Sequence, residues 1–550
     1  MSIFSIGLSG LDAAQNALNT TSNNISNVNT PGYNRELTLL SEGNVSGGVA
    51  VADIERQFNQ YVATQLNAAT SESQALKSYE TQVSQIDNLL ADGEAGLAPL
   101  MQNFFASLGD LAGAPSDPAA RQGVLGSADT LSAQFRSFDG YLQDMQEGIN
   151  TQIENEVTQI NNATQQLSGL NREIALAKAK QGEAPNSLLN QRDQLVTELS
   201  ERLDATLNIQ DGGTYNVTLE NGQPLVAGTR HFQLEAIDSA ADPQRTVIGY
   251  QDAAGNRIEL GEGTISGGAL GGLMSFRRET LDGAQNQLGH MAIALAEGFN
   301  AQHAEGVDLD GNPGEALFSI GEPRGYAHTD NAGSAEVSEV AIASLDSLRP
   351  TDYRIHVDPE GANTLNGLKV VRQDTGEVLT PGDEVRYDGA TRTLRFDGLA
   401  VRFSEGAMAE GDRFEVQAVR RGAGGIETRL RDLDRLAAGQ GEYAGAGDNR
   451  NALALQDLQS ESLVGGTATL NQAYASMVSD MGNRTNIVKV NLEAQQGLTD
   501  QLQAVQQSES GVNLDEEAAN LIRYQEFYQA NAKVIEIGSS LLDTILRLRA

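Results

Sequence analysis

Residues near the N-terminus follow a helical pattern of apolar and small positions. Alternating steps of three and four separate Leu11, Ala14, Leu18, Thr21, Ile25 and Val28. This spacing predicts one amphipathic helix within residues 1–29, with a narrow seam along one side. Thr30-Pro31-Gly32 ends the pattern, because proline disfavours helix at the preceding residue and glycine permits a turn.

The C-terminus carries a matching pattern. Steps of three and four separate Leu521, Tyr524, Tyr528, Asn531, Ile535, Gly538, Leu542 and Ile545. Asn513, with Glu516 three residues later, has the spacing of a helix N-cap. Each terminal helix therefore has a seam that needs a partner. The pattern leaves two possibilities open: a helix pair within one chain, or coiled-coil packing between subunits.

Long helices are also predicted inside the chain, over 57–92, 141–181 and 469–508. Their apolar positions fit heptad seams, and glutamine and asparagine fill much of the remaining surface. Helices of this length and composition are typical of an elongated bundle.

Two internal segments change to short alternating runs separated by turn residues, which predicts antiparallel β modules. The fold class is therefore mainly α with inserted β domains, around a discontinuous helical core built from both ends of the sequence. We assign residues 1–40 and 513–550 to a terminal coiled-coil domain, and 41–211, 270–348 and 422–512 to an elongated helical bundle. A small β module at 212–269 and an outer β domain at 349–421 complete the division.

Composition removes several classes of function. Lys and Arg total 37 against 74 Asp and Glu, a net charge of −37, which argues against nucleic-acid binding and against docking on anionic membranes. There is no cysteine, so disulfides, thiolate zinc sites and cysteine nucleophiles are excluded. No basic residue precedes Arg35 and no long apolar run occurs, so neither a cleaved secretory signal nor a membrane span is expected. Taken alone, this favours a cytoplasmic protein.

Candidate chemical sites do not rise above background. The segment 308–313 begins like a calcium loop, but Pro313 and Ser319 occupy the positions that need glycine and glutamate, so a turn is favoured. Residues 263–272 are glycine-rich without a phosphate-binding fingerprint, and we interpret them as a flexible linker. The five histidines are scattered. We expect no catalytic residues, no metal and no cofactor.

The two ends resemble the signatures of bacterial flagellar rod, hook and hook-associated proteins. The N-terminal signature is Asn23-Asn24-Ile25-Ser26-Asn27-Val28-Asn29-Thr30-Pro31-Gly32-Tyr33. Its C-terminal counterpart covers residues 511–525 and 528–535, from Gly511-Val512-Asn513-Leu514 onward. The length and the long internal helices favour the hook-associated junction proteins, the FlgK family. A hook protein would be expected to have less helix between its ends and its β domains.

The resemblance implies a structural adaptor, not an enzyme, that forms a ring of like subunits between hook and filament. It implies the hook protein and the next hook-associated junction protein as partners, and a cytoplasmic export chaperone that binds the C-terminal region. It also implies export to the extracellular flagellum without a cleaved signal, which overrides the cytoplasmic expectation. Two alternatives remain open at this point: a hook or rod subunit, and a wall-degrading enzyme on a rod-like frame.

The signatures and seams also supply the expected assembly interface. On the N-terminal side it comprises Leu11, Leu18, Asn23, Asn24, Ile25, Asn27, Val28, Thr30, Pro31, Gly32 and Tyr33. On the C-terminal side it comprises Asn513, Leu514, Leu521, Tyr524, Tyr528, Ala532, Ile535, Leu542 and Ile545.

Overall fold

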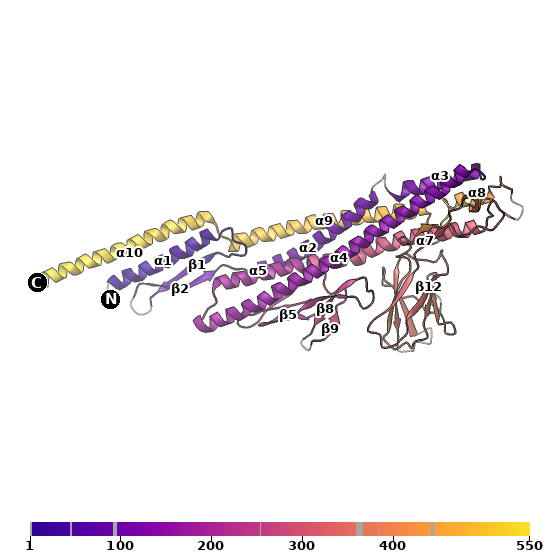
Figure 1. Ribbon diagram of the computed structural model, residues 1–550. Coiled ribbons are helices and arrows are strands. Elements are labelled where there is room, and N and C mark those ends of the chain that lie inside the picture. Colours follow the sequence, from indigo (N-terminus) through magenta and orange to yellow (C-terminus); the bar gives the residue numbers. More distant parts are fainter. Residues whose placement is uncertain are drawn as a thin grey trace.

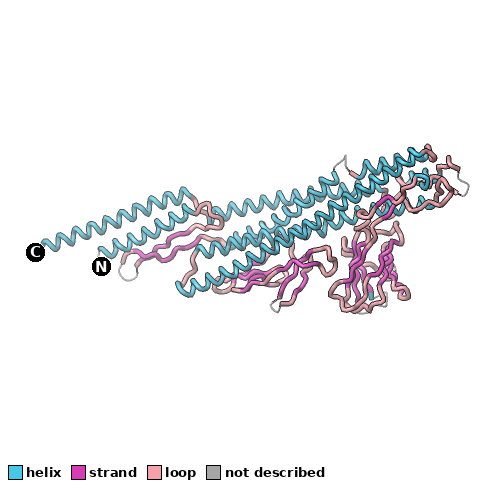
Figure 2. Tube along the Cα trace, in the orientation of Figure 1, coloured by secondary structure: helices cyan, strands magenta, loops and turns pink. Residues whose placement is uncertain are grey.

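The computed structural model describes residues 3–43, 47–91, 96–252, 255–358, 367–382, 384–441 and 445–549. It is a long helical rod with both chain ends at one extremity and two groups of strands along one side (Figures 1 and 2). The helical elements are α1 (Ile3–Ser26), α2 (Gln60–Ala91), α3 (Leu97–Gly113), α4 (Pro118–Gln181), α5 (Asn186–Arg202), α6 (Gly268–Phe276), η1 (Arg277–Leu281), α7 (Asp282–Ala304), η3 (Leu433–Arg435), α8 (Arg450–Asp457), α9 (Leu470–Ser510) and α10 (Leu514–Arg549).

The central bundle contains the long helices that the heptad pattern predicts. α2 and α9 begin and end within three residues of the predicted bounds and pack against each other. The segment 141–181 is the second part of α4, which begins much earlier, at Pro118. Asp117 caps this helix by accepting a hydrogen bond from the Ala119 amide at 3.0 Å, and proline at the first position has no amide to satisfy.

The glycine-rich segment 263–272 is not a flexible linker over its second part, so this expectation was wrong. Helix α6 begins at Gly268 and is almost entirely buried. A Cβ on Gly272 would lie 2.2 Å from the Ala75 carbonyl oxygen of α2. The glycines therefore allow α6 to approach the α2 backbone, a role that periodicity does not reveal in so short an apolar segment.

Between α5 and α6 the chain forms the small β module, with two antiparallel sheets in the orders β3-β4-β5-β6 and β7-β8-β9. Its strands are β3 (Thr206–Ile209), β4 (Tyr215–Thr218), β5 (Pro224–Ala227), β6 (Arg230–His231), β7 (Leu234–Asp238), β8 (Thr246–Gln251) and β9 (Arg257–Glu259). The first strand therefore begins before the expected boundary at residue 212.

The outer β domain is a sandwich of two four-stranded antiparallel sheets, β11-β18-β13-β14 and β12-β17-β16-β15. Its strands are β11 (Arg324–Ala327), β12 (Val337–Ile342), β13 (Asp352–Val357), β14 (Leu368–Arg372), β15 (Arg386–Asp388), β16 (Thr393–Phe396), β17 (Leu399–Phe403) and β18 (Arg413–Gln417). We call residues 324–417 the outer sandwich. Because β11 and β12 belong to it, assigning residues 324–342 to the helical bundle was wrong. Alternation in these two short strands is too weak to distinguish them from loop.

Two short ribbons complete the fold. β10 (Phe318–Ser319) pairs with β19 (Glu427–Thr428) where the chain enters and leaves the outer sandwich. β1 (Glu36–Glu42) and β2 (Val49–Arg56) form a hairpin that packs on α1. The terminal domain therefore extends past the expected boundary at residue 40. We call α1, the β1–β2 hairpin and α10 the terminal unit.

Candidate assembly site at the two chain ends

Helices α1 and α10 pair within one chain, and glycines let their backbones approach closely. A Cβ on Gly7 would lie 2.7 Å from Ile535 Cγ1, and one on Gly10 would lie 2.2 Å from Asn531 Oδ1. Near the other end of the contact, a Cβ on Gly538 would meet Ile3 Cγ2 at 2.7 Å. The contact therefore depends on small residues, which leave no room for larger side chains between the two helices.

The seam of α1 agrees with the expected one at Ala14 and Thr21 and differs from it at the large apolar positions. The buried positions of α1 are Gly7, Gly10, Ala13, Ala14, Ala17, Thr20, Thr21 and Asn24. Leu11, Leu18, Ile25 and Val28 are only half-buried. α1 lies between two partners, α10 and the β1–β2 hairpin, so small side chains occupy its most crowded faces. The pattern of large apolar residues is therefore displaced from the true seam.

The C-terminal seam faces α1 over only part of its length. Leu521, Tyr524 and Ile535 are half-buried, whereas Leu514, Tyr528, Ala532, Leu542 and Ile545 are exposed. From Ser539 to Leu548 every side chain of α10 is exposed. Figure 1 shows this end of α10 extending beyond the start of α1. The exposed face is strongly apolar, with Ile537, Leu541, Leu542, Ile545, Leu546 and Leu548.

The two signatures meet at Asn24, whose side chain is almost fully buried. Its amide nitrogen donates to the Glu36 carbonyl oxygen at 2.9 Å and to Glu517 Oε2 at 3.1 Å. Its amide oxygen accepts from the Tyr33 hydroxyl at 2.8 Å and from the Glu36 backbone amide at 3.0 Å. Every polar valence of the side chain is thereby satisfied. One asparagine thus links α1, the loop after it, β1 and α10.

Glu517 is equally buried and is held by Arg35. Arg35 Nε lies 2.8 Å from Glu517 Oε1, and Arg35 Nη1 lies 2.7 Å from Glu516 Oε2. The Arg35 amide also donates to the Ser510 carbonyl oxygen at the end of α9. We call Asn24, Tyr33, Arg35 and Glu517 the signature cluster. Within it, a charged hydrogen-bonded pair compensates for the burial of the carboxylate.

The signature cluster also affects the ionisation of the Tyr33 phenol. Burial, reinforced by the nearby carboxylates of Glu36 and Glu517, raises the pKa of Tyr33. The phenol therefore stays protonated and serves as a donor to Asn24.

Asn513 caps α10 as predicted, accepting from the Asp515 amide at 3.0 Å. The Glu516 side chain points towards Arg35 and forms an ion pair with it, so it does not take part in capping the helix. In the N-terminal loop, the Thr30 hydroxyl donates to Asn27 Oδ1 at 3.1 Å, and Gly32 has φ of +75°, which favours glycine. Asn23 and Pro31 are exposed; the Asn23 carbonyl oxygen accepts from the Asn27 side chain at 2.9 Å.

The signature loop is also joined to the bundle. Asn34 donates to Asn190 Oδ1 of α5 at 2.8 Å, and Arg56 pairs with Asp193 at 2.5 Å. A cleft of about 790 Å³ lies among the loop 28–34, α2, α5 and the end of α9.

Sequence reasoning did not identify Arg35, Glu517, Asn190 or Asp193 as partners of the signature. One signal was available: Arg35 is the first basic residue of the chain, and residues 515–517 are three consecutive acids at the start of α10.

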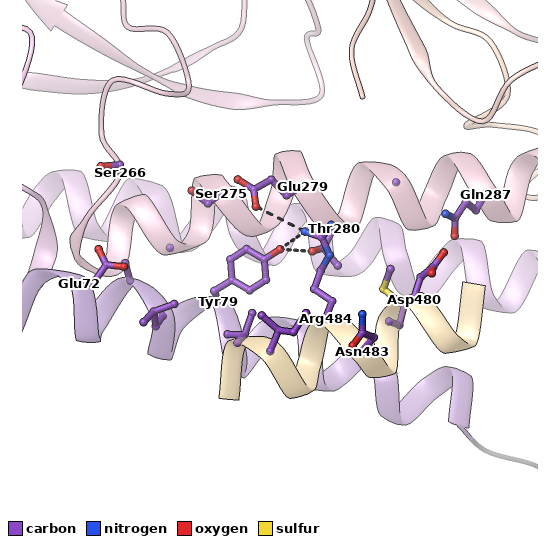
Figure 3. Close-up of a pocket in the computed structure, with 17 residues that line it drawn as sticks. Glu72, Tyr79, Ser266, Ser275, Glu279, Thr280, Gln287, Asp480, Asn483 and Arg484 are labelled. Atoms are coloured by element: carbon purple, nitrogen blue, oxygen red, sulfur yellow. Dashed lines mark hydrogen bonds and ion pairs between the residues drawn. The ribbon is translucent and has the colours of Figure 1, made fainter. Parts of the chain in front are cut away.

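A second pocket, of about 540 Å³, lies in the bundle among α2, α6–α7 and α9 (Figure 3). The Tyr79 hydroxyl lies 2.6 Å from Thr280 Oγ1 and accepts from Arg484 Nη1 at 2.9 Å. Figure 3 shows these three side chains converging from three helices. The phenol is thus used to connect helices, and the arrangement offers no nucleophile paired with a base.

The calcium-like segment forms a turn. Asp308 Oδ1 accepts from the backbone amides of Asp310 and Asn312 at 2.9 and 2.8 Å. Among the described residues, no group of three or more His, Asp or Glu side chains has an arrangement suited to a metal ion. In the same part of the chain, no helix is both long and apolar enough to cross a membrane.

Comparison with known proteins extends over the whole chain. Residues 83–318 match the family described as the flagellar hook-associated protein FlgK helical domain. Residues 4–34 match the flagella basal body rod protein family, and residues 506–548 match the flagellar basal body rod FlgEFG protein C-terminal family. The terminal matches cover both signatures, and the internal match is specific to FlgK.

Full-length relatives agree with these matches. Flagellar hook-associated protein 1 of Salmonella typhimurium is 40% identical over 563 residues, covering 100% of both chains. The Escherichia coli protein of the same name is 40% identical over 558 residues, again covering 100% of both. The flagellar hook junction protein FlgK from Burkholderia pseudomallei has a similar structure, with a TM-score of 0.75 and 28% identity, over 81% of this chain and 99% of that one. The chain therefore belongs to the flagellar hook-associated protein 1 family, FlgK.

Proposed function

We propose that the terminal unit is the surface through which this chain packs against further copies of itself and against its axial neighbours. Membership of the FlgK family makes the chain a structural subunit of the flagellum and not an enzyme. The two alternatives, a hook or rod subunit and a wall-degrading enzyme, were therefore wrong. As a flagellar hook-associated protein, it is an extracellular component.

The observation that carries the proposal is the exposed apolar end of α10. Burying a leucine or isoleucine side chain contributes roughly 1.5–3 kcal/mol. Leu541, Leu542, Ile545 and Leu546 are all about half exposed or more, at 48–62%, and lie within two turns of one helix. Clusters of this kind on a soluble chain mark protein contacts.

Further apolar surface lies on the rest of the terminal unit. Ile3, Ile6, Leu8, Leu39, Leu40 and Ile54 are exposed. A groove of about 250 Å³ opens among α1, the hairpin and α10, bordered by Ile6, Leu40, Tyr524 and Phe527. The terminal unit therefore offers apolar surface on each of its three elements, as repeated packing in a ring of like subunits requires.

The family context supplies the identity of the neighbours. We assign the hook protein to one axial side and the next hook-associated junction protein to the other. A cytoplasmic export chaperone would bind the C-terminal region before export and cover the α10 face that later meets other subunits. Export without a cleaved signal belongs to the same proposal.

Ile545→Asp tests this assignment. The substitution places a charge on a face that nothing in the described chain covers, so the folded monomer should keep its thermal unfolding midpoint, while assembly at the hook tip is lost. Asp543→Asn, two residues away on the same helix, is the matched control and should assemble normally. Normal filaments on the Ile545→Asp protein would contradict the proposal.

A further inference from the structure

A group of charges, two of them buried and three nearly so, occupies the place where three parts of the molecule meet. Asp242 and Arg245 come from the small β module, Asp282 from the start of α7, and Asp352 and Arg420 from the outer sandwich and the segment that leaves it. Arg420 pairs with Asp352 and lies 3.1 Å from Asp282. Arg245 also pairs with Asp282 and lies 3.5 Å from Asp242. We call these five residues the ion network.

Further polar contacts join the network to its surroundings. Gln417, the last residue of β18, donates to Asp242 Oδ2 at 2.8 Å. Glu262 lies 3.4 Å from Arg245 and 2.8 Å from Arg277. Arg277, whose side chain is fully buried, also donates to the Thr246 carbonyl oxygen at 2.8 Å. The same set of charges therefore contacts the bundle, the small β module and the outer sandwich.

A π-helical turn brings Arg277 and Asp282 to one side of the rod. η1 covers Arg277–Leu281, and the Asp282 amide donates to the Arg277 carbonyl oxygen, one π-turn earlier. Residues five apart in an α-helix lie well past one full turn, whereas a π-turn is wider and brings such residues closer to the same face. Both Arg277 and Asp282 can therefore reach the small β module.

The apolar cores of the outer sandwich and the bundle are largely separate. The sandwich core gathers residues such as Tyr353, Ile355 and Phe414 with one residue of α7, Ile293. Next to Ile293, the backbone of α7 approaches the segment that follows β18. A Cβ on Gly289 would lie only 2.0 Å from the Val419 carbonyl oxygen. This contact on α7, together with the packing of Asp346 and Leu348 against Gly465 and Gly466, seats the sandwich on the rod. Apolar contacts of this kind carry little directional preference.

Ion pairs restrict the orientation of the sandwich, which the apolar contact does not. Guanidinium and carboxylate groups are planar and hydrogen-bond in a fixed geometry, so a buried pair tolerates little displacement. Burial opposes ionisation of Asp282, yet Arg245 and Arg420 hold its pKa below the ordinary value. For Asp352 burial prevails over Arg420 and raises the pKa. A displaced sandwich would separate these charges from their partners in a site with little access to water.

We propose that the ion network fixes the orientation of the outer sandwich on the rod, with Arg420 as the positioning residue on the sandwich side and Arg245 on the side of the small β module. The sandwich is then a rigid projection at one defined angle, and its apolar and its ionic attachments to the rod have different roles. The contact at Gly289 and Ile293 holds it in place, and the ion network sets its direction.

Distances between two spin labels test this directly. The chain has no cysteine, so Ser137→Cys on α4 and Ala390→Cys on the outer sandwich, both exposed positions, would carry the only labels. The labelled parent should give one narrow distance distribution. Arg420→Met should lose the narrow peak, while hydrogen exchange in β13 and β18 stays slow because the sandwich core is unchanged.

Arg402→Met is the matched control, since Arg402 forms an exposed pair with Glu339 at 3.1 Å on the same sandwich. It should keep the narrow peak. If Arg420→Met prevents folding, Arg245→Met serves in its place, because Arg245 lies outside the sandwich and should cause the same loss of the narrow peak. A narrow peak retained in a folded Arg420→Met or Arg245→Met protein would overturn the proposal.

Discussion

The terminal unit and the outer sandwich treat their apolar residues in opposite ways. The sandwich has a closed core of its own, and Val378 is the one large, exposed apolar side chain among its described residues. The terminal unit exposes apolar side chains on all three elements and fills its internal contacts with glycine and alanine. One region buries its own apolar residues, and the other leaves apolar surface that, under the proposed function, partners would cover.

The difference predicts where a core substitution stays local. Phe414→Ala removes a fully buried ring from the sandwich core and should destabilise that domain by about 3–5 kcal/mol. Because the sandwich core is largely separate from the bundle, a separate early transition should emerge in calorimetry, while filaments still assemble. A single transition that shifts as a whole would show that the two cores unfold together.

A smaller but still large effect is expected at the signature cluster. Glu517→Gln removes the charge that Arg35 faces and leaves a buried guanidinium with a weaker partner, which should cost about 2–4 kcal/mol locally. The terminal unit should then exchange its amide hydrogens faster and be cleaved earlier by protease. Glu516→Gln alters the exposed partner of the same arginine and is the control, with an expected cost below about 1 kcal/mol. Equal effects of the two changes would contradict the role of burial.

Gly10→Ala probes the helix pair itself. The added methyl group would overlap Asn531, whose side chain must then move, and we expect a cost of about 1–3 kcal/mol. Loosening of α1 from α10 can be followed by hydrogen exchange of α1. Gly123→Ala is the control, because a Cβ there meets nothing within 4 Å and lies in the interior of a helix. That change should leave the terminal unit as it is.

The smallest effect on assembly is expected from removing the sandwich. Arg324 and Gln417 pair across β11 and β18, so its two ends lie side by side and a short Gly/Ser linker can join them. The excised chain should keep its helical circular dichroism and still support swimming, provided that Arg420, which loses its partner Asp352, is replaced by a neutral residue. A folded, exported chain that cannot seat filament subunits would place the sandwich within the joint.

The sequence predicts the long helices well and the site only in part. Heptads identify α2, α9 and much of α4, because a long periodic segment carries many concordant positions. The same reasoning placed Leu11, Ala14, Leu18, Thr21, Ile25 and Val28 on the α1 seam. The structure buries Ala14 and Thr21 of these, together with Gly7 and Gly10, which the pattern did not select. Hydrophobicity cannot reveal a contact whose basis is small size. The contact between Asn24 and Glu517 could not be predicted from the sequence either, because no local pattern connects the two ends of a chain.

The separation of Asn24 and Glu517 along the chain has a consequence for the order of events in folding. The two residues are 493 positions apart, so their hydrogen bond closes a loop that contains nearly the whole protein. Loop-closure entropy rises slowly with length, about 0.6 kcal/mol per doubling, so this closure is affordable thermodynamically. It is possible only once both ends are present. A chain cut short before Glu516 would leave the Arg35 guanidinium without its two carboxylates and one Asn24 donor without Glu517, so the signature cluster forms fully only in a chain that includes α10.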